Sequence, residues 1–170
     1  MRRKDREIKE FDDIIDVLSR CKVLHLALIS DGKPYAVPVN FGFIDHEGEG
    51  QKKLSIYIHG AGEGKKLDAI KTNPQVSFCA ETSVEASGPQ DAHADACKWT
   101  CFYESVIGFG TASLVENSKE RTTGLDTIMF HNGYKIPFGV KTIAYSAMAL
   151  AHTAVVKIEV SEITGKHHLK

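Results

Sequence analysis

Hydrophobic and polar residues alternate along this chain with two different periods. Near the start, Ile8, Phe11, Ile14, Ile15 and Leu18 recur every three or four positions, which predicts an amphipathic helix of about three turns. From residue 22 to about residue 115 the period is close to two, which is typical of β-strands with one buried face. The sequence therefore predicts one helix followed by a mostly stranded region.

Six strands are predicted, and most of them are joined by short connections. They cover residues 22–29, 35–44, 53–59, 76–80, 99–115 and 154–160. The first two are linked by Ser30-Asp31-Gly32-Lys33, in which Asp-Gly tolerates the positive backbone angles of a tight hairpin. In the fifth strand, Gly108 and Gly110 share one face and indicate a bend or a close backbone approach.

The remaining segments are predicted to be helices and polar connections. Helices are expected at residues 63–73, ended by Asn73-Pro74, and from Asn117 to about residue 131, with a further short helix within residues 140–150. Residues 45–52 and 82–98 are predicted to be polar loops, and residues 161–170 a polar tail. Hairpin-linked strands with few helices favour a six-stranded antiparallel barrel over a doubly wound sheet.

The second predicted strand, YAVPVNFGFI, has one bulky face and one small face. Tyr35, Val37, Val39, Phe41 and Phe43 form the bulky face, and Ala36, Pro38, Asn40 and Gly42 form the small one. A small face leaves room for a flat ligand, or it marks a barrel corner with no ligand. Because proline cannot donate a ladder hydrogen bond, Pro38 also predicts an edge strand or a bulge.

Length and composition favour a single domain spanning residues 1–170, because 170 residues with 42% hydrophobic content suit one core. The formal net charge of −1, from 21 basic and 22 acidic residues, argues against a nucleic-acid partner. No apolar stretch approaches the roughly 20 residues of a membrane span, and no signal-peptide pattern follows the charged start. We therefore expect a cytoplasmic protein with no membrane partner.

Four cysteines, Cys21, Cys79, Cys97 and Cys101, are then expected to be free thiols. His93, Cys97 and Cys101 recur every fourth residue and would share one face of a helix, as zinc ligands can. The spacing lacks a C-x-x-C pair, however, and the residues from Trp99 onward read as strand. An ordinary loop is the favoured interpretation, and no metal site is assigned.

The stretch YIHGAGEGKKLDAI, residues 57–70, joins a strand to a helix through three glycines and two lysines. It fits neither the P-loop pattern nor the G-x-G-x-x-G dinucleotide pattern. Glycines, free helix-start amides and a lysine charge can nevertheless hold a phosphate. Residue patterns alone leave two readings open, a phosphate cradle and a glycine-rich connector with solvated lysines.

Several segments together resemble a known family. MRRKDREI, VPVNFGF, YIHGAGEGKKLDAIKTNPQVSF, YESVIGFG and VVKIEVSEITGK are similar, in this order, to the nitroimidazole-resistance branch of the pyridoxamine 5'-phosphate oxidase-like, FMN-binding split-barrel proteins. The resemblance spans nearly the whole chain. It implies a six-stranded split β-barrel of Greek-key type and a homodimer with flavin at the subunit interface.

The resemblance also implies where the cofactor would lie. FMN is the expected cofactor, with FAD and then haem as alternatives. The implied contacts are Pro38, Val39 and Asn40 beside the flavin ring, His59, Gly60, Lys65 and Lys66 near the ribityl-phosphate, and Tyr103, Glu104 and Ser105 reaching the flavin of the partner subunit.

Two functional hypotheses follow from the resemblance. The first is a flavin-dependent reductase of small aromatic or nitro compounds, in which His59 is the catalytic residue and positions substrate or donates a proton with an ordinary pKa near 6.5. A strand-end histidine is otherwise usually structural. The second is a flavin or haem carrier without turnover, in which His25, His59, His131 and His152 are the candidate haem ligands.

Overall fold

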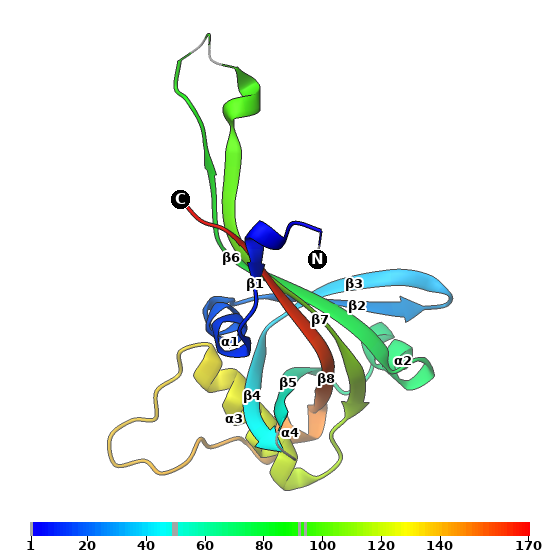
Figure 1. Ribbon diagram of the computed structural model, residues 1–170. Helices are drawn as coiled ribbons and strands as arrows, with labels where there is room; N and C mark the ends of the chain where they lie inside the picture. Colours follow the sequence, from blue (N-terminus) through cyan, green and yellow to red (C-terminus); the bar gives the residue numbers. More distant parts are fainter. Residues whose placement is uncertain (1, 49–50, 92, 94) are drawn as a thin grey trace.

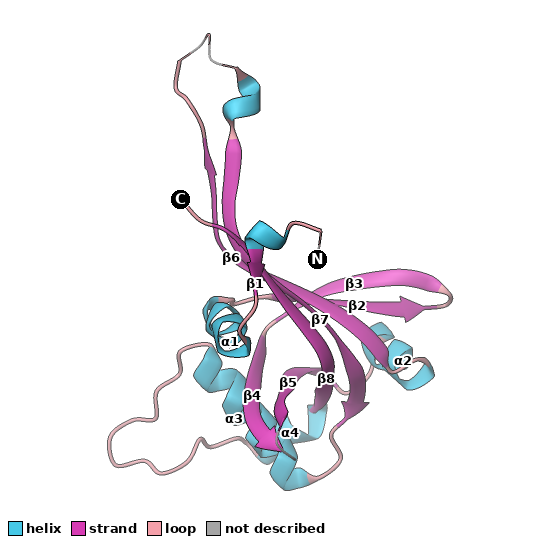
Figure 2. Cartoon of the chain, viewed as in Figure 1, coloured by secondary structure: helices cyan, strands magenta, loops and turns pink. Residues whose placement is uncertain are grey.

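The computed structural model describes residues 2–48, 51–91, 93 and 95–170, and in them the chain forms one strongly curved antiparallel sheet flanked by helices (Figures 1 and 2). The strands are β1 (Glu7–Ile8), β2 (Leu24–Ser30), β3 (Lys33–Val39), β4 (Phe41–Gly48), β5 (Gln51–Ala61), β6 (Gln75–Ser87), β7 (Thr100–Leu114) and β8 (Thr153–His168). The α-helices are α1 (Phe11–Arg20), α2 (Lys65–Thr72), α3 (Ser118–His131) and α4 (Ala147–His152). Two short 3-10 helices, η1 (Lys4–Arg6) and η2 (Ala96–Lys98), complete the described elements.

The sheet curls so that its two edge strands, which follow one another in the chain, come close together (Figure 1). The strand order is β3-β2-β6-β7-β8-β5-β4, with β1 pairing on β8. The edge strands β3 and β4 are separated only by Asn40. The hydrogen-bonded path of the described strands does not close between them. The architecture is therefore a split antiparallel β-barrel with flanking helices, as the sequence predicts.

The predicted number of six strands is wrong, because the predicted strand 35–44 is two strands. Val39 pairs with Leu24 on β2, whereas Phe41 pairs with Ile58 on β5. The alternation of bulky residues continues across Asn40, so the pattern gives no sign that the chain changes its pairing partner. The short strand β1 adds the eighth strand. Pro38 lies on the edge strand β3, in agreement with the prediction for a proline.

Strands extend into three segments predicted to be polar loops or a polar tail. β4 continues to Gly48 and β5 begins at Gln51, β6 continues to Ser87, and β8 continues to His168. With β7, the distal part of β6 forms an arm that projects from the barrel (Figure 1). Most side chains at the end of β6 are exposed. These segments are held by backbone pairing and do not require a buried face. The hydrophobic alternation that marks a strand in the sequence is therefore absent from them.

The helices agree with the predictions in part. Helix α3 begins as expected, with the side chain of Asn117 accepting hydrogen bonds from the amides of Lys119 and Glu120. Helix α1 begins at Phe11, since Ile8 pairs with Gly165 as part of β1. Within residues 140–150 the only helical residues are the start of α4. None of the described helices combines the length and apolar character that a membrane span requires.

The barrel interior is filled by the inward faces of the strands. Its fully buried large side chains include Leu24, Leu26, Phe41, Ile56, Ile58, Phe78 and Ile158. Helix α1 packs on this core through Ile14, Val17 and Leu18. A Cβ at Gly108 would overlap the Phe78 ring, so the predicted close approach at this glycine is confirmed.

Candidate functional site

The junction between β5 and α2 is shaped by glycines. His59 and Gly60 lie near the end of β5, and Gly64 precedes α2 with φ +125°, a conformation that favours glycine. The carbonyl of Gly64 accepts hydrogen bonds from the amides of Leu67, at 2.9 Å, and Asp68, at 3.1 Å. No side chain caps the start of α2. The helix therefore presents its positive dipole end at the junction.

Lys66 turns back from α2 over the end of β5. Its Nζ donates a hydrogen bond to the carbonyl of His59 at 3.3 Å. A Cβ at Gly60 would lie 3.0 Å from the same Nζ, so glycine leaves the space that the ammonium group uses. Burial lowers the pKa of Lys66.

Lys65 points in another direction. Its Nζ lies over the ring of Tyr35, 4.8 Å from the centroid, which is a cation–π geometry. The two lysines thus bracket the start of α2 rather than sharing one position.

His59 lies at the rim of an apolar cavity of about 190 Å³. The cavity is lined by His59, Leu125, Ile128, Met129, Tyr145, Ala149, Leu150 and Thr153. One polar group at its wall is fixed, because the hydroxyl of Tyr145 donates to Asp126 at 2.8 Å. The cavity is therefore suited to a small and mainly apolar molecule.

The pKa of His59 lies below its ordinary value. Partial desolvation is the larger cause, and the positive charge of Lys66 is the second. The ring is therefore less basic than a solvated histidine. At neutral pH the imidazole is uncharged, so it can donate one hydrogen bond and accept another but is a weak proton donor.

A second hollow lies between α2 and the turn that joins β2 and β3. This groove, of about 350 Å³, is lined by Ile29, Ser30, Asp31, Gly32, Lys65, Asp68, Ala69, Thr72 and Asn73. The carboxylates of Asp31 and Asp68 would repel a phosphate there. The side of α2 that carries Lys66 is better suited to an anion.

The small face of the predicted second strand has two different environments. At Gly42 a Cβ would overlap the backbone of Thr127, so α3 packs directly on β4. At Ala36 and Pro38, in contrast, the small face is exposed on the outside of β3. The small face therefore contacts α3 at Gly42 and is open to solvent at Ala36 and Pro38.

The exposed part of this face continues across four strands. The register places Pro38, His25, Cys79 and Ile107 in one row, on β3, β2, β6 and β7. The next row is Ala36, Ala27, Ser77 and Phe109. Ile107 is 50% and Phe109 49% exposed. A broad surface of small and apolar side chains therefore lies open on the outer face of the sheet.

Val39 does not lie on this open surface, whereas Asn40 is exposed. Val39 packs against the barrel core. The side-chain amide of Asn40 donates to the carbonyl of Lys22 at 3.4 Å and to the side chain of Asn132 at 3.5 Å. Asn40 therefore helps to hold the seam between β3 and β4.

Tyr103, Glu104 and Ser105 lie near the beginning of β7, far from His59 within one chain. His59 pairs with Val155, and the neighbouring Val156 pairs with Leu114 at the other end of β7. Leu114 follows Tyr103 by eleven positions, which is roughly 36 Å along an extended strand. These three residues can meet the β5–α2 junction only if a second copy of the chain supplies them.

Glu104 already has a partner within the chain. Its carboxylate forms two contacts with the guanidinium group of Arg20 on α1, at 2.5 and 2.9 Å. This bidentate pair lowers the pKa of Glu104. Glu104 thus ties α1 to β7.

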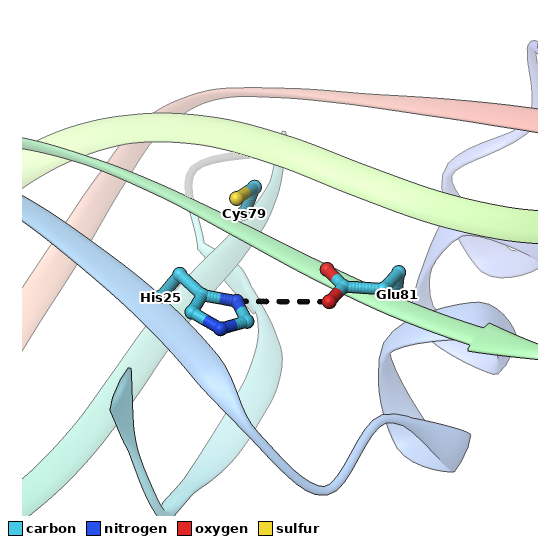
Figure 3. A group of neighbouring side chains, drawn as sticks. All are labelled: His25, Cys79 and Glu81. Atoms are coloured by element: carbon cyan, nitrogen blue, oxygen red, sulfur yellow. Dashed lines mark ion pairs between the residues drawn. The ribbon is translucent and has the colours of Figure 1, made fainter. Parts of the chain in front are cut away.

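His93, Cys97 and Cys101 are not gathered into a metal site. Cys97 lies in η2, and Cys101 lies on β7. In the part of the chain that the structure describes, three potential metal ligands come together elsewhere, at His25, Cys79 and Glu81 (Figure 3). The sequence analysis missed this group because His25 is far from Cys79 and Glu81 in the chain and meets them only through strand register.

By its architecture, the protein is a split antiparallel β-barrel in which a lysine-containing junction joins a strand to a helix. The chain belongs to the pyridoxamine 5'-phosphate oxidase family, because the family model of that name matches residues 10–167. No curated protein sequence gave a significant match.

Solved structures share the fold. A candidate 5-nitroimidazole antibiotic resistance protein from Bacteroides thetaiotaomicron has 23% identity and a TM-score of 0.72, with 95% of this chain and 86% of that chain covered. The flavocytochrome Anf3 from Azotobacter vinelandii has 17% identity, a TM-score of 0.76 and coverage of 100% and 72%. An FAD and haem binding protein from Mycobacterium smegmatis has 18% identity, a TM-score of 0.73 and coverage of 95% and 73%.

Proposed function

We propose that the protein binds a flavin, FMN in the first instance, and acts as a flavin-dependent reductase of small aromatic or nitro compounds. The observation that carries this proposal is the β5–α2 junction of a pyridoxamine 5'-phosphate oxidase family member, where Lys66 lies over Gly60 beside an uncapped helix start. A flavin would supply the electron-transfer chemistry, and the protein would supply binding and orientation.

The residues at the junction suit the phosphate of such a cofactor. The amides at the start of α2, the ammonium group of Lys66 and the nearby Lys65 offer directed donors and positive charge. The partly buried position of Lys66 makes its charge more effective than that of a solvated lysine, because the local dielectric is lower.

His59 would position the substrate. Its imidazole borders the apolar cavity under α3 and α4, and its lowered pKa keeps it neutral near pH 7. A neutral imidazole can donate a hydrogen bond to a nitro or carbonyl oxygen while the cavity wall packs on an aromatic ring.

The active form would be a homodimer that pairs the outer faces of the sheets. Exposed Ile29, Ile107 and Phe109 provide the apolar surface. A second copy would also explain how Tyr103 and Ser105, on this same face of β7, could approach a flavin. FAD in place of FMN, and the cytoplasmic location expected from the sequence, stay predictions.

The experiment starts with the absorbance of the protein as purified, which should show flavin bands. Replacing both Lys65 and Lys66 by Ala should release the cofactor, whereas replacing Lys71, at the far end of α2, should not. Full flavin affinity in the double variant would overturn the phosphate assignment. Anaerobic stopped-flow with reduced nicotinamide and a nitroaromatic tests turnover, and failure of every nitro compound to reoxidise the flavin would contradict the reductase.

The alternative is a flavin or haem carrier without turnover. It is supported by the two structural neighbours whose names include haem or cytochrome. Of the four candidate ligands, His131 is committed to a backbone contact, with Nε2 2.7 Å from the carbonyl of Cys21. Soret absorbance in place of flavin bands would favour this alternative.

A further inference from the structure

His25, Cys79 and Glu81 bring three different metal-binding groups together on the outer face of the sheet (Figure 3). One potential ligand atom from each side chain lies within 4.8 Å of the others. The side chains come from two strands, β2 and β6. They lie outside the β5–α2 junction, on the outer face that the proposed homodimer would pair, and the flavin proposal assigns them no chemical role.

The sheet register fixes the positions of all three side chains. His25 and Cys79 are directly opposite each other in the β2–β6 ladder, which sets their Cβ atoms about 4.5 to 5.5 Å apart. Glu81 follows Cys79 by two residues, so it projects from the same face of β6. The backbone therefore preorganises the group, and only side-chain rotations are needed to close it around an ion.

The distances leave room for an ion between the ligands. Nδ1 of His25 and Oε1 of Glu81 are 3.8 Å apart, which is longer than a hydrogen bond. A tetrahedral zinc ion with bonds of about 2.0 to 2.3 Å would hold such atoms about 3.4 to 3.6 Å from one another. The widest pair in the group must therefore approach by only roughly 1 Å.

The charges also favour a cation. A thiolate at Cys79 would lie beside the negatively charged carboxylate of Glu81, so the two groups together need a positive counter-charge. A divalent ion would supply that charge. In a single chain the side chains of His25 and Glu81 are 42% and 45% exposed, so an ion can enter from solvent before the outer faces of two copies pair.

We propose that His25, Cys79 and Glu81 bind a divalent cation of the zinc type, with water or a small ligand in the fourth position. The combination of imidazole nitrogen, thiolate sulfur and carboxylate oxygen suits zinc, whereas calcium and magnesium prefer oxygen ligands alone. Because these residues are separate from Lys65 and Lys66, the metal site does not depend on the assignment of the flavin phosphate.

Cobalt(II) is the probe, since it reports a sulfur ligand through thiolate-to-metal charge-transfer absorbance. The full-length protein, with any cofactor it retains, is titrated with Co²⁺ and read as a difference spectrum against the metal-free sample. One Co²⁺ should bind per chain with a charge-transfer band, and Zn²⁺ should displace it. Cys79→Ser should abolish the band, and Glu81→Gln should weaken binding by more than about tenfold, since even outer-shell partners contribute that much.

The matched control is the double variant Cys97→Ser/Cys101→Ser, which removes both exposed thiols and should keep the band. The proposal is overturned if the wild-type protein gives no charge-transfer band, if Cys79→Ser keeps it, or if the double control variant loses it. Should Cys79→Ser fail to fold by circular dichroism, the exposed Glu81→Gln decides. An unchanged Co²⁺ affinity in that variant would then overturn the site.

Discussion

Lys66 Nζ lies 3.3 Å from the carbonyl oxygen of His59, so a helix residue closes over the end of the preceding strand. Gly60, the next residue of the strand, has no side chain that would block the ammonium group of Lys66. Desolvation is the larger cause of the lowered pKa of the His59 ring, and the charge of Lys66 is the second. The proposed phosphate anchor and the proposed substrate-positioning residue are therefore electrostatically coupled.

The two lysines should contribute unequally to flavin binding. Lys66→Ala removes the partly buried ammonium group and should weaken flavin affinity by about ten- to a hundredfold, the usual value of a hydrogen bond to a charged group. Lys65→Ala, whose Nζ rests on Tyr35, should have a smaller effect. Fluorescence titration of the apoproteins with FMN measures both. Equal losses for the two variants would contradict the assigned geometry.

The charge of Lys66 should be visible in the titration of His59. Lys66→Met keeps an apolar stem but removes the charge, so the pKa of His59 should rise while staying below its ordinary value, because desolvation persists. NMR titration of the imidazole Cε1 proton measures the change, with the resonance assigned from His59→Gln. Lys65→Met is the control and should leave the His59 pKa in place.

Acid should destabilise the fold through His131. Burial lowers the pKa of this ring, so its contribution to the free energy of unfolding is complete above the unfolded pKa near 6.5. The contribution is lost as the pH falls through the folded pKa, with a slope of at most about 1.4 kcal/mol per pH unit.

His131→Phe separates two effects. The variant should lose about 1 to 3 kcal/mol at pH 8, because the carbonyl of Cys21 loses its donor, yet it should be less sensitive to acid than the wild type. Urea unfolding at pH 8 and pH 5.5 measures both quantities. An acid slope identical to that of the wild type would show that His131 is not responsible, and exposed His93→Phe serves as the control.

Helix α3 should be sensitive to one added methyl group at β4. In Gly42→Ala the new Cβ meets the backbone of Thr127, which cannot rotate away, so the free energy of unfolding should fall by about 1 to 3 kcal/mol. Gly62→Ala is the matched control, because its Cβ would lie 3.9 Å from the carbonyl of His152, an ordinary contact. Similar stabilities for the two variants would argue against direct packing of α3 on Gly42.

The sequence predicts the barrel well where one strand face is buried. Leu24, Leu26 and Leu28 mark β2 without ambiguity, and all three are buried. The same hydrophobic alternation hides the change of pairing strand at Asn40, because Val39 and Phe41 both face the core. It is also absent from the arm, where paired strands have few buried side chains. Strand pairing, and so the number of strands, is a property of the folded backbone that periodicity does not encode.

The candidate site, like the fold, can be predicted from the sequence only in part. Residues 59–66 lie together in the chain, so the junction could be predicted from one segment. The role of each lysine could not, since Lys65 and Lys66 are adjacent but turn toward different strands. His25 and Cys79 are separated by more than fifty residues, and only the β2–β6 register brings them into one row.

The strand order has a consequence for the way the chain folds. β2–β3 and β4–β5 are local hairpins that can form as soon as they are synthesised, but β8 comes last among the described strands and inserts between β5 and β7. Until residues 153–168 are available, β5 and β7 keep unpaired edges. Such long-range pairing slows folding and leaves strand edges open to aggregation. A nascent or truncated chain that lacks β8 should therefore depend strongly on chaperones.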